Sequence, residues 1–271
     1  MKNIELKLLL IIILVGTLGL IGWANNWLHL TSFSKNFVPI APLASVLFIF
    51  TSITYSSLYL KNNKLIKLLA YPLLILTLFL ALFNLVDFFF IPEWSFNHLL
   101  FSYLLGETAY GHMYPLAGIL FIMSSIFFIL LKTNNQKITQ FFLKTIYIIP
   151  FLISIFFLIG YIENIIQFYS HRWLLLSAPT ALSFFILSLV QLHIIEFKIW
   201  PFQYFSKTDI TSRLIKIFLP ATLIFVLIIE TLNVHYSSYF DKYFSPIVLL
   251  VIVIVFIYFM IIIISRRWVK I

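Results

Sequence analysis

Ser177-Ala-Pro-Thr-Ala-Leu-Ser-Phe-Phe185 opens one of the long apolar runs of this 271-residue chain. Three other runs open in a similar way and read Ile40-Ala-Pro-Leu-Ala44, Met113-Tyr-Pro-Leu-Ala117 and Phe244-Ser-Pro-Ile-Val248. Proline fits the first turn of a helix, because the N–H group that it lacks would have no intrahelical acceptor there. The sequence therefore predicts that helices begin at Pro42, Pro115, Pro179 and Pro246.

The spacing of these prolines indicates an internal repeat. They lie 73, 64 and 67 residues apart, and each interval is long enough for two membrane crossings. The pattern predicts a helix pair that is used four times within a single transmembrane domain. The approximate limits of the four pairs are 1–67, 68–140, 141–212 and 213–271.

Composition predicts that these runs lie in a membrane. With 62% hydrophobic and 10% charged residues and a mean hydropathy of +1.08, the chain is too apolar for a soluble domain of this size. Backbone groups in lipid must bond within their own segment, and the runs lack the polar alternation of barrel strands. We expect an all-α, polytopic transmembrane bundle of about eight helices. Their predicted limits are 6–24, 39–60, 68–90, 114–131, 142–162, 178–197, 214–233 and 246–265.

The formal charge of +9 arises from basic residues beside the helix ends, which argues against nucleic acid as a partner. With the N-terminus in the cytoplasm, fifteen of the 18 Lys and Arg residues fall on the inner side, and only Lys35, Arg172 and Lys242 fall outside. This bias predicts a multi-pass protein of the inner (plasma) membrane with both termini cytoplasmic. The alternative is a signal peptide that ends at Ala24, but its run is as long as the other helices.

Polar residues near the outer helix ends are the first candidates for a ligand site. Asn26, Glu163 and Glu230 each lie 16 residues before a helix-opening proline, and Asp87 lies 28 residues before Pro115. Ionisable groups at membrane depth usually face a bundle interior or a watery cavity. In the alternative interpretation these carboxylates reach water at the interface and bind nothing.

The histidines are also distributed asymmetrically, since five of the six fall on the predicted outer side and only His193 lies towards the inner end of a helix. Together with the outer acids they suggest a divalent metal site or a pH-responsive cluster. No two have the i, i+4 spacing of a helical metal motif, and solvent-facing histidines are the alternative. The sequence assigns no particular metal or cofactor. The candidate ligand-binding set is Asn26, Asp87, His112, Glu163, His171, Glu230 and His235.

Catalytic motifs are absent from the sequence. It has no Gly-rich phosphate loop, no G-x-S-x-G motif and no H-E-x-x-H motif. It contains no cysteine that could serve as a nucleophile, and its seven glycines leave little room for a phosphate-binding loop. We therefore expect that this chain is not itself an enzyme.

Three features carry a resemblance to a known family. The first is Trp27-Leu-His-Leu-Thr-Ser32, which is followed by a proline motif in Phe37-Val-Pro-Ile-Ala-Pro42. The second is the recurrence of this proline motif in Gly111-His-Met-Tyr-Pro-Leu-Ala117 and Ser177-Ala-Pro-Thr-Ala-Leu182. The third is the end of the chain, where Arg213-Leu-Ile-Lys-Ile-Phe-Leu-Pro220-Ala precedes Arg266-Arg267-Trp268. The chain resembles the eight-helix sensory regions, with repeated Met-x-Pro-Thr-Ala motifs, of bacterial membrane histidine kinases and diguanylate cyclases. It departs from them because Met is kept only at Met113 and Thr-Ala only at Thr180-Ala181, and no kinase or cyclase sequence is present.

The resemblance implies a sensory domain of the two-component type, either excised or free-standing, with a cytoplasmic kinase or cyclase output. A second copy of the chain is the other protein partner that we consider. Our leading hypothesis is a membrane sensor that binds a small ligand, lipid or ion near the outer helix ends and transmits a helix shift to the cytoplasm. The competing hypothesis is a small transporter or channel, because transporters also use internal repeats. A lipid-modifying enzyme is the third.

Overall fold

The computed structural model describes residues 2–34, 37–60, 63–90, 111–132, 136–162 and 175–195. All regular secondary structure in these ranges is helical, which confirms the predicted all-α class. The chain divides into two compact units, Met1–Ile195 and Glu196–Ile271, and all described residues belong to the first. The helices predicted at 214–233 and 246–265, with Pro246, lie outside the described residues, so the count of eight stays a prediction.

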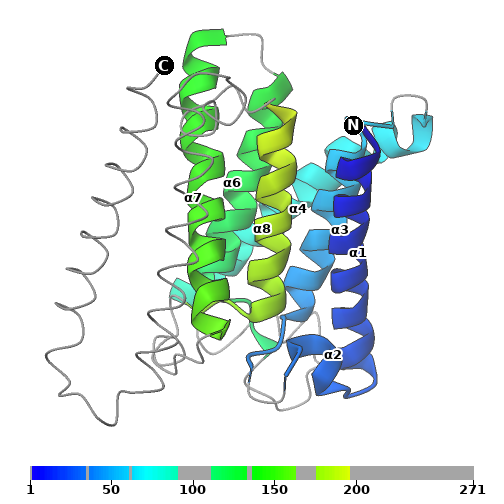
Figure 1. The fold of residues 1–271 in the computed structure, drawn as a ribbon, viewed down its shortest axis with the longest axis vertical. Coiled ribbons are helices and arrows are strands. Elements are labelled where there is room, and N and C mark those ends of the chain that lie inside the picture. Colours follow the sequence, from blue (N-terminus) through cyan, green and yellow to red (C-terminus); the bar gives the residue numbers. More distant parts are fainter. Residues whose placement is uncertain are drawn as a thin grey trace, which may run out of the picture. The chain divides into compact units, whose positions relative to one another are not determined.

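The first unit is a bundle of long helices whose directions alternate (Figure 1). Each of the six predicted helices within the described ranges has a counterpart, and the short helix α2 is an addition that the sequence did not predict. The bounds are α1 Lys2–Ala24, α2 Leu28–Ser32, α3 Pro42–Ser56, α4 Lys64–Phe90, α6 Pro115–Lys132, α7 Gln136–Ile162 and α8 Ala178–Ile194.

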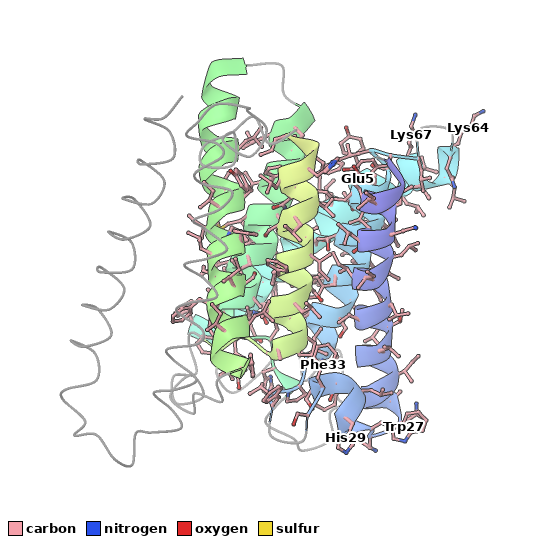
Figure 2. All side chains as sticks on the ribbon, viewed as in Figure 1. Glu5, Trp27, His29, Phe33, Lys64 and Lys67 are labelled. Carbon is pink, nitrogen blue, oxygen red and sulfur yellow. The ribbon has the colours of Figure 1, made fainter. Side chains whose placement is uncertain are left out.

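The two ends of this bundle differ in character. Helices α3, α6 and α8 begin at one end, which we call the proline end, and α1 and α4 begin at the other (Figure 1). Figure 2 places Glu5, Lys64 and Lys67 at this second end, which we call the basic end, and Trp27 and His29 at the proline end.

Three helices start at the repeated proline motif. Helix α3 begins at Pro42 and α6 at Pro115, while α8 begins at Ala178, one residue before Pro179. Ser177 is the N-cap of α8, and its hydroxyl accepts a hydrogen bond from the backbone N–H of Thr180 at 3.3 Å. Such a cap satisfies one of the backbone donors that a helix start leaves without an intrahelical acceptor.

The segments that lead into α3 and α8 are fixed in the same manner. Trp23, near the end of α1, donates its indole N–H to the carbonyl oxygen of Ile40 at 2.7 Å. Tyr161, near the end of α7, donates its hydroxyl to the carbonyl oxygen of Leu176, also at 2.7 Å. In both cases an aromatic donor closes the connection between two consecutive long helices, so the hydrogen bond ties a helix pair at the proline end.

The three proline-opened helices meet at one aromatic contact in the core. Phe48 of α3, Phe121 of α6 and Phe184 of α8 are fully buried, and their ring centroids lie 4.7–4.8 Å apart in all three pairs. Rings at such distances and tilted angles gain about 0.5–1.5 kcal/mol per pair beyond the burial of their surface. Each phenylalanine lies five or six residues after its helix-opening proline, so the trio follows the internal repeat.

Glycines allow α1 to pack closely on α3. A Cβ atom on Gly16 would lie 2.8 Å from the carbonyl oxygen of Ser45, and one on Gly19 would lie 2.5 Å from the Ser45 hydroxyl. Small residues at a helix interface let the backbones approach each other, as in membrane helix pairs. This seam holds α1, and with it Glu5, against the rest of the bundle.

Candidate functional site

The structure describes three of the seven residues predicted to bind a ligand. Asn26 is exposed at the end of α1, Asp87 is buried in α4, and His112 is half-buried just before α6. The other four, Glu163, His171, Glu230 and His235, lie outside the described residues.

Asn26 has a clear conformational role. Its φ of 57° is left-handed, and its N–H donates to the carbonyl of Trp23 at 3.3 Å, while the N–H of Trp27 donates to the carbonyl of Gly22 at 2.7 Å. This pair of bonds is the Schellman motif that ends many helices, and Asn is one of the few residues that tolerate its left-handed position. The exposed Asn26 therefore terminates α1.

Asp87 does lie in a polar pair within the bundle. It is 5% exposed, and Asn84, one turn earlier on the same face of α4, is 1% exposed. Within the described ranges, however, no three His, Cys, Asp or Glu side chains gather in a way that would hold a metal ion. The geometry of Asp87 is compatible with a hydrogen-bonding site at the proline end.

A second polar site, which the sequence did not predict, lies at the basic end. Glu5 sits in the first turn of α1 and is 2% exposed. Nδ1 of His193, in the last turn of α8, lies 2.7 Å from Oε1 of this carboxylate. A carboxylate buried among apolar helices requires a charged or hydrogen-bonding partner, and His193 supplies it although it lies far from Glu5 in the sequence.

Next to this pair, Tyr55 connects three helices. The tyrosine, on α3, is 1% exposed and donates its hydroxyl to the carbonyl oxygen of Ser124 on α6 at 2.7 Å. The same hydroxyl accepts a hydrogen bond from Nε2 of Gln191 on α8 at 2.8 Å. The Tyr55 hydroxyl thus uses both its donor and its acceptor capacity to link α3, α6 and α8.

Tyr59 lies near both groups. It follows the end of α3, one turn beyond Tyr55, within electrostatic range of Tyr55 and Glu5. We group Glu5, Tyr55, Tyr59, Gln191 and His193 under the name inner polar cluster. It lies where α1, α3 and α8 meet at the basic end.

Several buried atoms of this region have no hydrogen-bond partner among the described residues. They include Oε2 of Glu5, the hydroxyl of Tyr59 and Oε1 of Gln191. The hydroxyls of Ser52, Ser124 and Ser188 are in the same condition, and Ser52 and Ser188 lie one turn before Tyr55 and Gln191 on their helices. Native proteins leave few buried polar atoms unsatisfied, so their concentration here makes the cluster a candidate site.

Sequence reasoning missed this cluster because Glu5, between Lys2 and Lys7, resembles a residue of a charged helix end at the interface. Its burial depends on α8, which is separated from it by nearly the whole first unit. The available signal was on α8, where Ser188, Gln191 and His193 interrupt the otherwise apolar second half of the helix.

A comparison of the chain with protein-family models, with curated proteins and with solved structures finds no match. The resemblance to sensory regions thus stays a prediction, and the functional argument depends on the geometry of the first unit.

Proposed function

We propose that the chain is an integral membrane domain that transmits a signal through a movement of α8. Support for the membrane comes first from α1 and α4, whose segments Ile4–Ala24 and Lys64–Phe89 are long and apolar enough to cross a bilayer by length and composition. Only 33% and 22% of an apolar 18-residue window within these two segments is buried, whereas the core helix of a soluble protein is mostly buried.

The exposed face of α4 is the clearest feature of this kind. Large apolar side chains recur on it at three- and four-residue intervals, which places them on one side of the helix. Exposure of this surface to water would be unfavourable by roughly 25 cal/mol per Å², and lipid removes that penalty. Lys64 and Lys67, at the start of α4, suit the cytoplasmic headgroup region. The face comprises Leu65, Leu68, Tyr71, Ile75, Phe79, Leu82, Val86 and Phe89.

The observation that carries the signalling function is the attachment of the last turns of α8. His193 connects them to α1 through its ion pair with Glu5, and Gln191 connects them to α3 through its hydrogen bond to the Tyr55 hydroxyl. The second unit begins at Glu196. A ligand can replace polar contacts such as these with bonds to itself, but it cannot replace the apolar packing of Phe48, Phe121 and Phe184 in this way. A ligand that favours one arrangement of these bonds shifts the position of α8.

In this proposal the domain resides in the inner membrane with both termini in the cytoplasm, and its partner is a cytoplasmic kinase or cyclase output. The four helix pairs and the predicted ligand region near the outer helix ends belong to the same hypothesis. Asn26, Asp87 and His112 are the described residues with which that region is to be tested.

The test is the behaviour of α8 when its attachment is broken. Because the chain has no native cysteine, Ile195→Cys gives a single thiol directly after α8 whose labelling rate in nanodiscs reports its exposure. Glu5→Gln in this background should change the labelling rate, and a cyclase output fused after Ile271 should change its basal activity. Lys7→Gln, an exposed position on the same helix, is the matched control. Unchanged labelling and output in Glu5→Gln would refute the proposal.

Transport is the second candidate function, and the buried Glu5 favours it because acids inside membrane bundles often mark ion or proton paths. Reconstituted protein that carries a cation across liposomes, with a loss of flux in Glu5→Gln, would establish transport instead of signalling.

A further inference from the structure

We propose that the inner polar cluster binds a small cation with N–H donors, that is, ammonium or a primary alkylammonium ion. This proposal specifies the ligand class for the signalling function and rests on it only for the consequence of binding. The binding itself is a separate claim about Glu5, Tyr59 and Gln191.

The chemistry of the unsatisfied atoms selects the ligand. Oε2 of Glu5 and Oε1 of Gln191 can only accept hydrogen bonds, and both are buried without a partner among the described residues. The Tyr59 hydroxyl, also buried, can accept as well as donate. A ligand that satisfies two obligate acceptors must bring donors, and an ammonium group brings three or four.

Charge selects the same class. Glu5 is 2% exposed and, in the part of the chain that the structure describes, its ion pair is with His193. That pair engages only Oε1, so the second carboxylate oxygen offers negative charge to a ligand. An anion would be repelled by this oxygen, and an uncharged apolar molecule would leave it unsatisfied in a medium of low dielectric constant.

Divalent metals fit the cluster less well. Transition metals select several His, Cys or carboxylate ligands, and no group of three such residues occurs within the described ranges. Calcium takes six to eight oxygen ligands, usually from several carboxylates, and the cluster contains one carboxylate. An ammonium ion requires no fixed set of ligands, so one carboxylate oxygen and two further acceptors are sufficient for it.

Binding would act directly on the attachment of α8. A cation at Oε2 neutralises the Glu5 carboxylate and thereby weakens its attraction for His193, and it draws the Gln191 carbonyl towards itself. Both changes loosen the bonds that fix the last turns of α8 to α1 and α3. The expected consequence is a displacement of Ile195, the last described residue after the helix.

The binding test uses the full chain in nanodiscs of uncharged lipid at pH 7 and constant ionic strength. Ammonium and methylammonium chloride should raise the unfolding temperature in a saturable manner. Tetramethylammonium, which lacks N–H donors, and potassium, which has the same charge, should not. An equal, saturable rise with potassium or tetramethylammonium, or no rise with ammonium and methylammonium, would overturn the proposal.

Variants locate the site. Glu5→Gln keeps the shape of the side chain but removes its charge, and Gln191→Leu removes the second acceptor. Each should weaken methylammonium binding by at least about tenfold. Ser125→Ala is the matched control, because Ser125 is buried beside Ser124 but bonds within its own helix to the Phe121 carbonyl. Binding that survives both cluster variants would place the ligand elsewhere and refute this site.

The Ile195→Cys labelling assay separates the two proposals. If methylammonium binds without a change in labelling, the ligand assignment stands and the transmission through α8 fails. If Glu5→Gln changes the labelling but no ammonium ion binds, the transmission stands and the ligand assignment is wrong.

Discussion

Nδ1 of His193 lies 2.7 Å from Oε1 of Glu5, so a residue near the start of the sequence of the first unit is in direct contact with a residue near its end. The contact joins α1 to α8, two helices that are not adjacent in the sequence. Glu5 is almost completely buried, whereas the side chain of His193 is 27% exposed. The pair is thus asymmetric, and its two partners should respond differently to substitution.

His193→Ala should destabilise the domain more than Glu5→Gln. Removal of the histidine leaves a buried carboxylate without its ion-pair partner, which costs about 3–5 kcal/mol in fully buried pairs and about 2 kcal/mol here because His193 is partly exposed. Glu5→Gln retains a hydrogen-bond acceptor and removes the buried charge. Denaturant titration in mixed micelles measures both free energies of unfolding, and an equal loss in the two variants would contradict the asymmetry.

Tyr55→Phe should lower the free energy of unfolding by about 1–3 kcal/mol. The substitution leaves the Ser124 carbonyl and Nε2 of Gln191 without the hydroxyl to which they bond. Tyr71→Phe, on the exposed face of α4, is the control and should change stability by less than about 0.5 kcal/mol. In a double-mutant cycle with Gln191→Leu, the effects should be strongly non-additive, since both side chains share one hydrogen bond.

Gly19→Ala should lower the free energy of unfolding much more than Gly118→Ala. A methyl group on Gly19 would lie 2.5 Å from the Ser45 hydroxyl and 2.8 Å from Cγ2 of Ile40, whereas one on Gly118 would lie 3.3 Å from the carbonyl oxygen of Ala81. We expect a loss of about 1–3 kcal/mol for Gly19→Ala and a change near zero for Gly118→Ala. Thermal unfolding of the two variants side by side would test this order, and a reversed order would rule out the close packing of α1 on α3.

Asn26→Gly and Asn26→Val separate a conformational role from a ligand role. Glycine adopts the left-handed φ of position 26 at no steric cost and should preserve stability, while valine should reduce it by about 1–2 kcal/mol. Thermal unfolding measures this difference. If Asn26→Gly keeps the unfolding temperature but loses the response of the domain to its ligand, the predicted binding role of Asn26 is supported as well.

Local signals in the sequence were sufficient to predict where the long helices of the first unit begin. The prolines at 42, 115 and 179 reveal helix starts because proline acts on its own backbone and on the residues beside it. The end of α3 at Ser56, four residues before its predicted limit, was less accessible, because the turn at Ser57–Tyr59 forms through bonds to the last carbonyls of that helix.

The inner polar cluster was not accessible from local pattern. The burial of Glu5 depends on a helix that begins at Ala178, and the role of Tyr55 depends on Ser124 and Gln191, which lie 69 and 136 residues further along the chain. The aromatic donors Trp23 and Tyr161 were missed for a similar reason, since their acceptors are backbone carbonyls that no residue type identifies.

The hydrogen bonds from Trp23 to Ile40 and from Tyr161 to Leu176 have a consequence for biosynthesis. The first of them can form as soon as α1 and the start of α3 have left the ribosome, so the contact between these two helices is closed early. Glu5, in contrast, gains its partner only when the ribosome has added the rest of the first unit, up to His193. A nascent chain truncated before α8 would lack the His193 partner of Glu5, and we expect such a chain to be less stable and to be degraded faster than one that contains α8.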